Sequence, residues 1–585
     1  MRRNLLSGLA VLALACGTAG PALAAPAKKA KAQPAATSQP TPQPTMAWKD
    51  FTQATIDRWL ALDPSFAVYQ GAHQFDGKLP DWSDAGLKTR GDFLRSVIAQ
   101  AKAYTALAGT DAFERDYLIQ VAEGQLFWLE DADQPHTNPA FYINGGLDPN
   151  VYISREYTSK EARMKVMIAF FEAVPEAAKQ IRANLHAPLP ASFIKHGISG
   201  FGGFATYYRG DARAAFADTG DAVLQTLYRE ASEKAAQSMT DLADWLKTQQ
   251  PTATQDFALG AAKFSRMLKA TEGVDVPLAR LEAVGRADLR RNQTALKQAC
   301  AAYAPGKSIP DCFAKLNAEK PPEGPVAAAT KQIPDLTAFV REHDLVSIPG
   351  TEQALVRQSP PYNAQNGAYI DPPGPYEKGI PSIYYIAPPD PSWSKEKQLE
   401  YIPGVKDLLF TSVHEVMPGH FLQFLHSNRS PSWIGRLFVG YAYAEGWAHY
   451  SEEMMWEAGL GNGDPGTHVG QLSNALLRNC RFLSAIGLHS GKMTQAQSDA
   501  MFRTQCYQGA GTAEQQAARG TYDPAYLNYT LGKLMIRKLR TDWTTKHGGR
   551  SAWKAFHDQF LSYGGPPIPL VRKAMMNEPT AKAVF

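Results

Sequence analysis

The chain has 585 residues, of which 44% are hydrophobic, 20% charged and 10% aromatic. This composition is typical of a large globular protein and excludes a disordered chain. The 60 basic and 56 acidic residues leave a formal charge of +4, which gives no reason to expect binding to nucleic acid or to an anionic membrane surface.

The N-terminus has the pattern of an export signal. Two arginines precede an apolar run too short to span a bilayer, and a small-residue cleavage site, Ala-Leu-Ala, follows at 22–24. Residues 1–24 are therefore predicted to be a signal peptide, and the mature protein is expected to be periplasmic or secreted. Cleavage before Cys16 would instead make it a lipoprotein, and this alternative stays open. Residues 25–45, rich in Ala and Pro, are predicted to be a flexible linker.

Helical periodicity dominates residues 46–585. Apolar residues recur at steps of three and four from Val223 to Leu246, which predicts a helix of about six turns. Thr158 to Glu161 resembles a capping box and is expected to open another helix. No stretch in this part is apolar enough to cross a membrane. We therefore predict one mainly α-helical domain, built as a single body or as two lobes around a cleft.

Four cysteines follow the predicted signal peptide: Cys300, Cys312, Cys480 and Cys506. Local closure favours the pairs Cys300–Cys312 and Cys480–Cys506, as expected in an oxidising compartment. Four free thiols are the alternative. Because the chain has no Cys-x-x-Cys pair, we expect neither a cysteine zinc cluster nor a thioredoxin-like redox centre.

Residues 360–390 depart from the helical pattern. They are crowded with Pro, Gly, Tyr and Asn and end in the run from Ser382 to Ala387, whose β-branched and aromatic residues are bounded by prolines. This pattern predicts an edge strand. The strand lies just before the histidine-rich part of the chain.

Residues 414–489 contain six of the thirteen histidines, beginning with the segment His414-Glu415-Val-Met-Pro-Gly-His420. In an H-E-x-x-H helix, two histidines at i and i+4 share one face and bind zinc, and the glutamate acts as a general base. Here the histidines are six residues apart, which puts them about 240° apart around an undistorted helix. We expect Pro418 and Gly419 to interrupt the helix and bring His420 back beside His414.

A third metal ligand is expected from a second helix. Glu445 follows His420 by 25 residues and would complete a two-histidine, one-glutamate site with a position open for water. His449 is the competing ligand, because Glu445, His449 and Glu452 share one helical face. A solvated helix face without any metal is the remaining alternative.

These motifs, His414 to Gln423 and Glu445 to Ala448, resemble the bacterial domain-of-unknown-function 885 family (DUF885), itself similar to the gluzincin metallopeptidases. Three later segments are also similar to family motifs: Arg478–Arg481 with Gly487–His489, Tyr522, and Tyr529–Gly532. The resemblance implies a large helical zincin-like fold with a deep cleft and a small β-sheet beside the metal helix. Such a fold is found in oligopeptidases and carboxypeptidases of the neurolysin and angiotensin-converting-enzyme type.

The resemblance also implies one Zn²⁺ ion per chain and a set of residue roles. It assigns the metal to His414, His420 and Glu445, the general base to Glu415, and a place near the scissile carbonyl to Tyr529. Substrate contacts are expected from His489, Arg481 and Tyr522. The chain departs from the family pattern at His449, usually apolar, and at Ala485, usually an acid. The first departure leaves the ligand set open, and the second affects the orientation of His489.

The expected function is zinc-dependent hydrolysis of peptide bonds in short peptides. Zinc lowers the pKa of its water from about 15.7 towards about 7, and Glu415 would move the proton to the leaving amine. Three arginines, Arg478, Arg481 and Arg503, are candidates to hold a substrate carboxylate, and ordinary arginines on helix surfaces are the alternative. The strand at 382–387 is expected to pair with the substrate backbone.

Two other classes of function remain open. One is a catalytically inactive peptide-binding or scaffold protein of the same fold, although a binder would not need Glu415. The other is a non-peptidase hydrolase, and for a serine hydrolase the segment Gly197–Phe201 lacks the last glycine of G-x-S-x-G. The sequence does not decide between exopeptidase and endopeptidase action.

Overall fold

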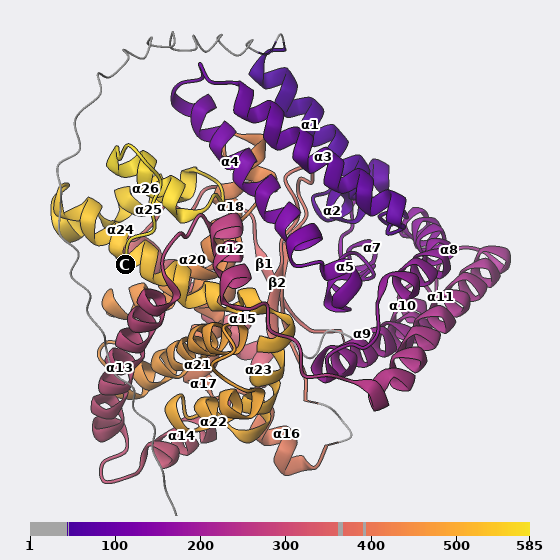
Figure 1. The fold of residues 1–585 in the computed structure, drawn as a ribbon. Coiled ribbons are helices and arrows are strands. Elements are labelled where there is room, and N and C mark those ends of the chain that lie inside the picture. Colours follow the sequence, from indigo (N-terminus) through magenta and orange to yellow (C-terminus); the bar gives the residue numbers. More distant parts are fainter. Residues whose placement is uncertain (1–43, 45, 361–366, 390–392) are drawn as a thin grey trace, which may run out of the picture. The chain divides into compact units, whose positions relative to one another are not determined.

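Helices form most of the chain in the computed structural model, which describes residues 44, 46–360, 367–389 and 393–585 (Figure 1). The predicted signal peptide, Cys16 and nearly all of the predicted linker lie outside the described residues. Within the described part, no helix combines the length and the hydrophobicity that a membrane span needs.

The first half of the described chain forms a helical layer with its own hydrophobic core. Helix α11 packs against α8 and α9, and α3 packs against α4. Most of the apolar stripe predicted on α11 is buried, with Tyr228, Met239 and Leu246 at 1% exposure or less, but Val223 and Leu227 near its start are 68% and 49% exposed. The α-helices of this half are α1 (Trp48–Leu62), α2 (Pro64–Tyr69), α3 (Asp84–Ala103), α4 (Gly109–Leu126), α5 (Gln134–Thr137), α6 (Ala140–Ile143), α7 (Val151–Ser154), α8 (Lys160–Asn184), α9 (Ala191–Arg209), α10 (Asp211–Ala215) and α11 (Ala222–Gln249).

The start of α8 differs by one residue from the sequence expectation. Its N-cap is Ser159, whose hydroxyl accepts a hydrogen bond from the amide of Ala162. Glu161 therefore stands one position too early to close a capping box with this residue, and the predicted box is not formed.

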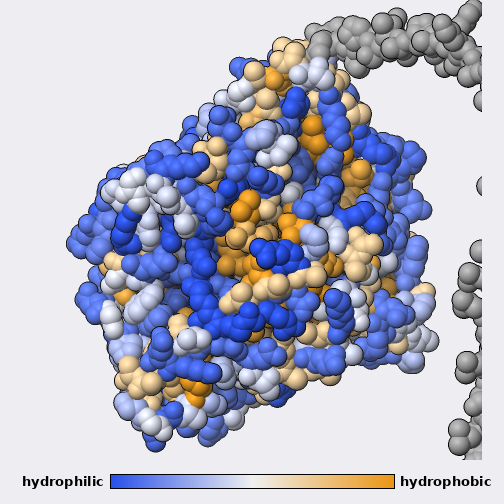
Figure 2. All heavy atoms as spheres, turned by 60° about the vertical axis from the view of Figure 1, so that its left-hand side comes forward, coloured by the Kyte–Doolittle hydropathy of each residue, from blue (hydrophilic) through white to orange (hydrophobic). Residues whose placement is uncertain are grey.

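The second half has a separate hydrophobic core, formed mainly by helices from α12 onward. Its closest helix pairs are α20 with α24 and α13 with α21. The α-helices of this half are α12 (Ala261–Glu272), α13 (Leu278–Tyr303), α14 (Ile309–Ala318), α15 (Pro325–Glu342), α16 (Lys395–Tyr401), α17 (Val405–Glu415), α18 (His420–Ser427), α19 (Trp433–Leu437), α20 (Tyr441–Glu457), α21 (Pro465–His489), α22 (Gln495–Gln505), α23 (Ala510–Tyr522), α24 (Asn528–Thr545), α25 (Trp553–Ser562) and α26 (Ile568–Met576). Figure 2 shows a largely hydrophilic face on which hydrophobic side chains gather near the centre.

A three-stranded sheet lies in the second half, in the order β1 (Ala354–Gln358), β3 (Ser382–Ile386), β2 (Ala368–Asp371). Strand β3 runs parallel to β1 and antiparallel to β2, and its five residues are all buried. The prediction that this segment is an edge strand is therefore wrong. Its flanking prolines lie outside the paired residues, so they end the strand without blocking hydrogen bonds on either side.

Both predicted disulfides are present. Cys300–Cys312 joins α13 to α14, and Cys480–Cys506 joins α21 to the residue that follows α22. Each bond closes a short loop between helices that are neighbours in the sequence, as local closure predicted.

Candidate metal centre

The two histidines of the central motif lie on either side of a helix break. Helix α17 ends at Glu415 and α18 begins at His420. The amide of Gly419 donates to the carbonyl of Val413 at 2.9 Å. A Cβ atom on Gly419 would lie 1.8 Å from the carbonyl oxygen of His414, so only glycine permits this approach. The break brings the two imidazoles together, with ring centroids 4.8 Å apart.

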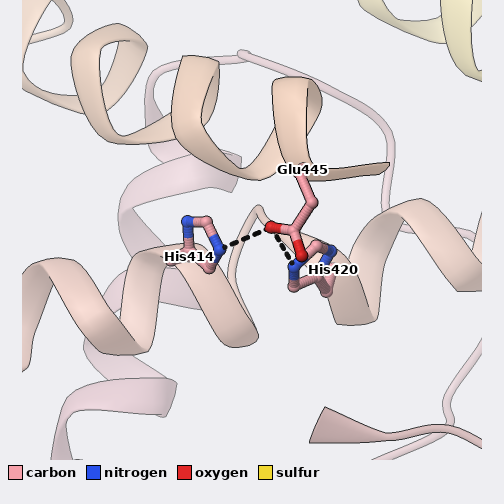
Figure 3. Close-up of side chains that lie close together, drawn as sticks. All are labelled: His414, His420 and Glu445. Atoms are coloured by element: carbon pink, nitrogen blue, oxygen red, sulfur yellow. Dashed lines mark hydrogen bonds and ion pairs between the residues drawn. The ribbon is translucent and has the colours of Figure 1, made fainter. Parts of the chain in front are cut away.

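Glu445 reaches both histidines from α20. Its Oε2 lies 3.2 Å from Nε2 of His414 and 3.3 Å from Nε2 of His420, and Figure 3 shows the three side chains pointing toward one another. One ligand atom from each residue lies within 4.8 Å of the others. A tetrahedral zinc ion with bonds of about 2.1 Å separates its ligand atoms by about 3.4 Å. The spacing and the donor types therefore fit a zinc ion.

A buried carboxylate orients the first histidine. Oε1 of Glu452 lies 2.7 Å from Nδ1 of His414, and a terminal nitrogen of Arg478 lies 3.2 Å from the same atom. A proton on Nδ1, donated to Glu452, would leave Nε2 as the nitrogen that faces Glu445 and the candidate metal position, as in carboxylate–histidine–metal arrangements. Burial by itself raises the pKa of Glu452, but Arg478 at 3.3 Å and two imidazoles hold that pKa well below its usual value. His420 lacks such a support, since its Nδ1 is buried without a hydrogen-bond partner among the described residues.

His449, the competing ligand, does not approach the other two histidines. Its Nδ1 lies 3.2 Å from the second oxygen of Glu452, and its side chain is fully buried. The structure thus brings Glu445 to the candidate metal position and places His449 behind Glu452.

The two residues that follow Glu445, Gly446 and Trp447, hold α20 against its neighbours. A Cβ atom on Gly446 would lie 2.5 Å from Cα of Gly532, so the backbones of α20 and α24 touch there. Trp447 donates from its indole nitrogen to the carbonyl of Pro418 at 2.8 Å. This bond ties α20 directly to the helix break that carries the histidines.

Glu415 is buried beside the three candidate ligands. Its side chain is 8% exposed and forms no hydrogen bond with other described residues. Burial raises the pKa of Glu415, and the adjacent imidazoles of His414 and His420 oppose that rise. A carboxylate in this environment can take up a proton more readily than one in water.

Tyr529, at the start of α24, lies next to this group. Its ring centroid is 6.2 Å from that of His414, and the guanidinium of Arg481 stacks over the same ring at 4.8 Å. Burial and the nearby charge of Glu445 raise the pKa of Tyr529, so its hydroxyl stays protonated and can donate a hydrogen bond.

A cavity of about 2700 Å³ opens beside the candidate metal position. Both halves of the described chain line it, and its wall includes Arg481, Tyr522 and Tyr441. The three candidate ligands are not among its lining residues. Two lining residues, Tyr441 and Arg481, contact the ring of Tyr529, and that ring packs against His414. Tyr522 stacks on His196 at a ring distance of 4.0 Å.

His489, which the sequence predicts to contact substrate, is not among the residues that line the cavity. This side chain is 1% exposed, and its Nε2 donates to the carbonyl of Gly520 at 2.7 Å. Its Nδ1 accepts from the amide of Leu259 at 3.3 Å, and its ring stacks on Phe264. Since both nitrogens are satisfied by backbone groups, His489 joins α21 to its neighbours within the core.

Sequence reasoning gave no role to Glu452, Trp447 or Tyr441. Glu452 had a usable signal, because it stands seven residues after Glu445 on the same helical face. The other two contacts depend on how distant segments pack, and no local pattern marks them.

Two solved structures share this fold. One, from Shewanella oneidensis, is a proposed lipoprotein of unknown function; it matches with a TM-score of 0.74 at 24% identity, over 91% of this chain and 100% of its own. The other, a proposed lipoprotein from Colwellia psychrerythraea, matches with a TM-score of 0.73 at 17% identity, over 90% of this chain and 99% of its own. No curated protein matches the chain.

The sequence itself matches a family over most of its length. Residues 64–575 match the family described as "Bacterial protein of unknown function (DUF885)". This range includes the helix break, the helix that carries Glu445, and Tyr529. The chain therefore belongs to the DUF885 family.

Proposed function

We propose that the protein is a zinc-dependent peptidase that hydrolyses short peptides. The observation that supports this most directly is the meeting of His414, His420 and Glu445 around one point, with the free carboxylate of Glu415 buried beside them. Two imidazoles, one carboxylate and an adjacent general base are the groups that a zinc hydrolase requires.

Each neighbouring side chain has a role in this reaction. When bound by the three ligands, zinc would supply a Lewis acid that polarises the carbonyl and acidifies water. Glu415 accepts the proton of the attacking water and returns it to the leaving amine. The hydroxyl of Tyr529 donates to the oxyanion that develops on the carbonyl oxygen. Glu452 keeps His414 in the tautomer that can bind a metal.

The strand predicted to pair with the substrate backbone, at 382–387, is not free to do so. Strand β3 is paired on both sides, whereas β2 pairs only with β3 among the described strands, and its Tyr369, Ile370 and Asp371 line the cavity. We assign backbone pairing with an extended peptide to β2.

Export to an oxidising compartment is part of the proposal. Two disulfides are typical of proteins that fold outside the cytosol. Two proteins of the same fold are proposed lipoproteins. The intact mass of the mature protein distinguishes a lipid on Cys16 from cleavage after Ala24.

Metal content and turnover of purified variants test the proposal. The wild type is expected to hold one zinc per chain, and His414→Ala and His420→Ala are each expected to lose it. Glu415→Gln should keep the zinc while peptide hydrolysis falls about 100- to 10,000-fold. His343→Ala and Glu342→Gln, at the exposed end of α15, are the matched controls. Full activity in Glu415→Gln would refute the assigned base, and zinc retained by both histidine variants would refute the site.

A further inference from the structure

The three arginines that could hold a substrate carboxylate differ in their partners. Arg478 already contacts Glu452 at 3.3 Å, and it belongs to the support of His414. Arg503 is exposed and pairs with Asp499 at 2.7 Å. Arg481 forms no ion pair with any carboxylate of the described residues. Arg481 therefore has no carboxylate to balance its charge in the described structure, whereas Arg478 and Arg503 each have one.

Arg481 is held in a fixed orientation at the cavity wall. Its Nε donates to the side-chain oxygen of Gln516 at 2.7 Å, and its guanidinium stacks on the ring of Tyr529. The side chain is 8% exposed and lines the cavity, and its two terminal nitrogens make no hydrogen bond with other described residues. These nitrogens are free to bind a group that enters the cavity.

The surroundings of Arg481 favour an anion. Burial lowers the pKa of Arg481, and the positive charges of Arg519 and Arg478 lower it further. Arg519 is balanced by Asp523 at 2.9 Å and does not offer its own charge to a ligand. Because a buried guanidinium without a counter-ion is costly, a carboxylate bound there would be stabilised strongly.

The contacts of Tyr529 set an upper limit on the distance from Arg481 to the ring of His414. The guanidinium lies 4.8 Å, and the ring of His414 6.2 Å, from the same Tyr529 ring. The two groups are therefore no more than about 11 Å apart. A metal bond of about 2 Å and a hydrogen bond of about 2.9 Å take up part of this distance, and each extended residue spans about 3.5 Å. The remainder, at most about 6 Å, has room for no more than one or two residues.

We propose that Arg481 binds the C-terminal carboxylate of the substrate, so that the protein removes one or two residues from the C-terminal end of short peptides. This inference rests on the proposed peptidase function and adds the end at which cleavage occurs. The planar guanidinium can form two parallel hydrogen bonds with a carboxylate. Hydrolysis consumes one water, breaks one peptide bond, and gives a shortened peptide with a new carboxylate plus a released amino acid or dipeptide.

Three peptides of one core sequence test the proposal. The first ends in a free carboxylate, the second in an amide, and the third in glutamic acid amide, whose only terminal carboxylate is a side chain. The free acid should be cleaved about 10- to 100-fold faster, measured as kcat/KM, than the amide. Mass spectrometry should find one or two residues released from its C-terminus. Recognition of any carboxylate would make the third peptide as good as the first, whereas recognition of the α-carboxylate leaves it as poor as the second.

Variants of Arg481 locate the effect. Arg481→Gln should reduce the ratio of acid to amide cleavage to about one, while Arg481→Lys, which keeps the charge, should retain part of it. Arg503→Gln, on the same cavity wall, should keep the full ratio. Zinc content and the melting temperature of each variant identify any that fail to fold. Equal cleavage of acid and amide by the wild type, or an unchanged ratio in Arg481→Gln, would overturn the proposal.

A protein without peptidase activity can be distinguished from one whose Arg481 does not bind a carboxylate. Zinc-loaded wild type that cleaves none of the peptides would refute the proposed function alone. Titration calorimetry with the same three peptides then tests Arg481 separately. The free acid should bind more tightly than the amide, and Arg481→Gln should abolish that difference. Equal binding of acid and amide by the wild type would refute the carboxylate site.

Discussion

Consecutive residues of α20 contact three different parts of the molecule. Glu445 faces the two histidines, Gly446 touches the backbone of α24, and Trp447 bonds to the carbonyl of Pro418. One turn later along α20 is His449, and two turns later is Glu452. Glu452 contacts Nδ1 of His414, and His449 contacts Glu452. A short segment thus sets both the candidate ligand and the groups that orient the other ligands.

The first residue-scale prediction concerns the third ligand. Glu445→Ala should strip zinc, because it removes the carboxylate that meets both histidines, and His449→Ala should largely spare it. Glu452→Gln should weaken zinc binding about 10- to 100-fold, since the support of His414 loses its charge. Zinc content after dialysis against graded chelator measures all three. Metal lost from His449→Ala but kept by Glu445→Ala would transfer the role to His449.

A second residue-scale prediction concerns Glu272, at the end of α12. It is 2% exposed, accepts a hydrogen bond from Asn528 at 2.8 Å, and has a pKa raised by burial to about 8. Between pH 4.5 and 8 the folded chain keeps a proton that the unfolded chain releases, so this group's contribution to stability is lost as the pH rises.

In the wild type, the proton held by Glu272 should make the free energy of unfolding fall by up to about 1.4 kcal/mol per pH unit between pH 4.5 and 8. Glu272→Gln cannot titrate and should remove this fall. Urea unfolding at pH 5, 6, 7 and 8 measures the free energy of unfolding of both proteins. Glu230→Gln, on the exposed face of α11, should follow the wild type. A Glu272→Gln curve parallel to that of the wild type would contradict a proton held by this side chain.

At the scale of elements, the crossing of α20 and α24 places Glu445 near Tyr529. The two helices touch through glycines: a Cβ atom on Gly532 would lie 1.9 Å from the carbonyl oxygen of Ala442 and 2.7 Å from Cα of Gly446. No other residue permits this separation. The crossing distance, and with it the position of the candidate ligand, depends on these two positions.

Gly532→Ala should therefore lower the free energy of unfolding by about 1–3 kcal/mol or more, because the helices must separate. Zinc binding should weaken with it, since Glu445 moves with α20. Gly511→Ala is the matched control in α23, where an added Cβ meets nothing within 4 Å. That variant should gain about 0.5–1 kcal/mol. Denaturant unfolding and zinc titration of both variants check the prediction, and equal effects at the two sites would contradict it.

For the whole molecule, the relevant feature is a large cavity between the two hydrophobic cores. Residues attached to both cores line the cavity, and the candidate metal position lies in the second half, next to the cavity wall. Under the proposed function, a substrate chain enters this cavity to reach Arg481. We therefore expect access to depend on the size of the substrate.

The prediction at this scale is that short peptides are hydrolysed and long or folded chains are not. Peptides of graded length, incubated together with casein and followed by mass spectrometry, measure the dependence. Cleavage should fall as length increases and leave casein largely intact. Rapid digestion of casein at a rate independent of length would contradict restricted access without affecting the zinc chemistry.

Local patterns in the sequence predicted the features that neighbouring residues determine. The helical period predicted the buried stripe of α11, and short spacing predicted both disulfide pairs. Pro418 and Gly419 predicted the helix break, because a missing amide and a missing Cβ act at the position where they occur. Sequence motifs also predicted membership of the DUF885 family.

Packing between segments distant in the chain determines the remaining features, which no local pattern could predict. Glu445 and His449 share one helical face, and the rotation of α20 set by Gly446 against Gly532 determines which of them meets the histidines. Strand β3 is central because β1 and β2 pair with it, and β1 comes from 28 residues earlier, at Ala354 against Ser382. Likewise, Arg481 differs from Arg478 in having no carboxylate beside it in the described structure, because packing brought Glu452 to the one and not to the other.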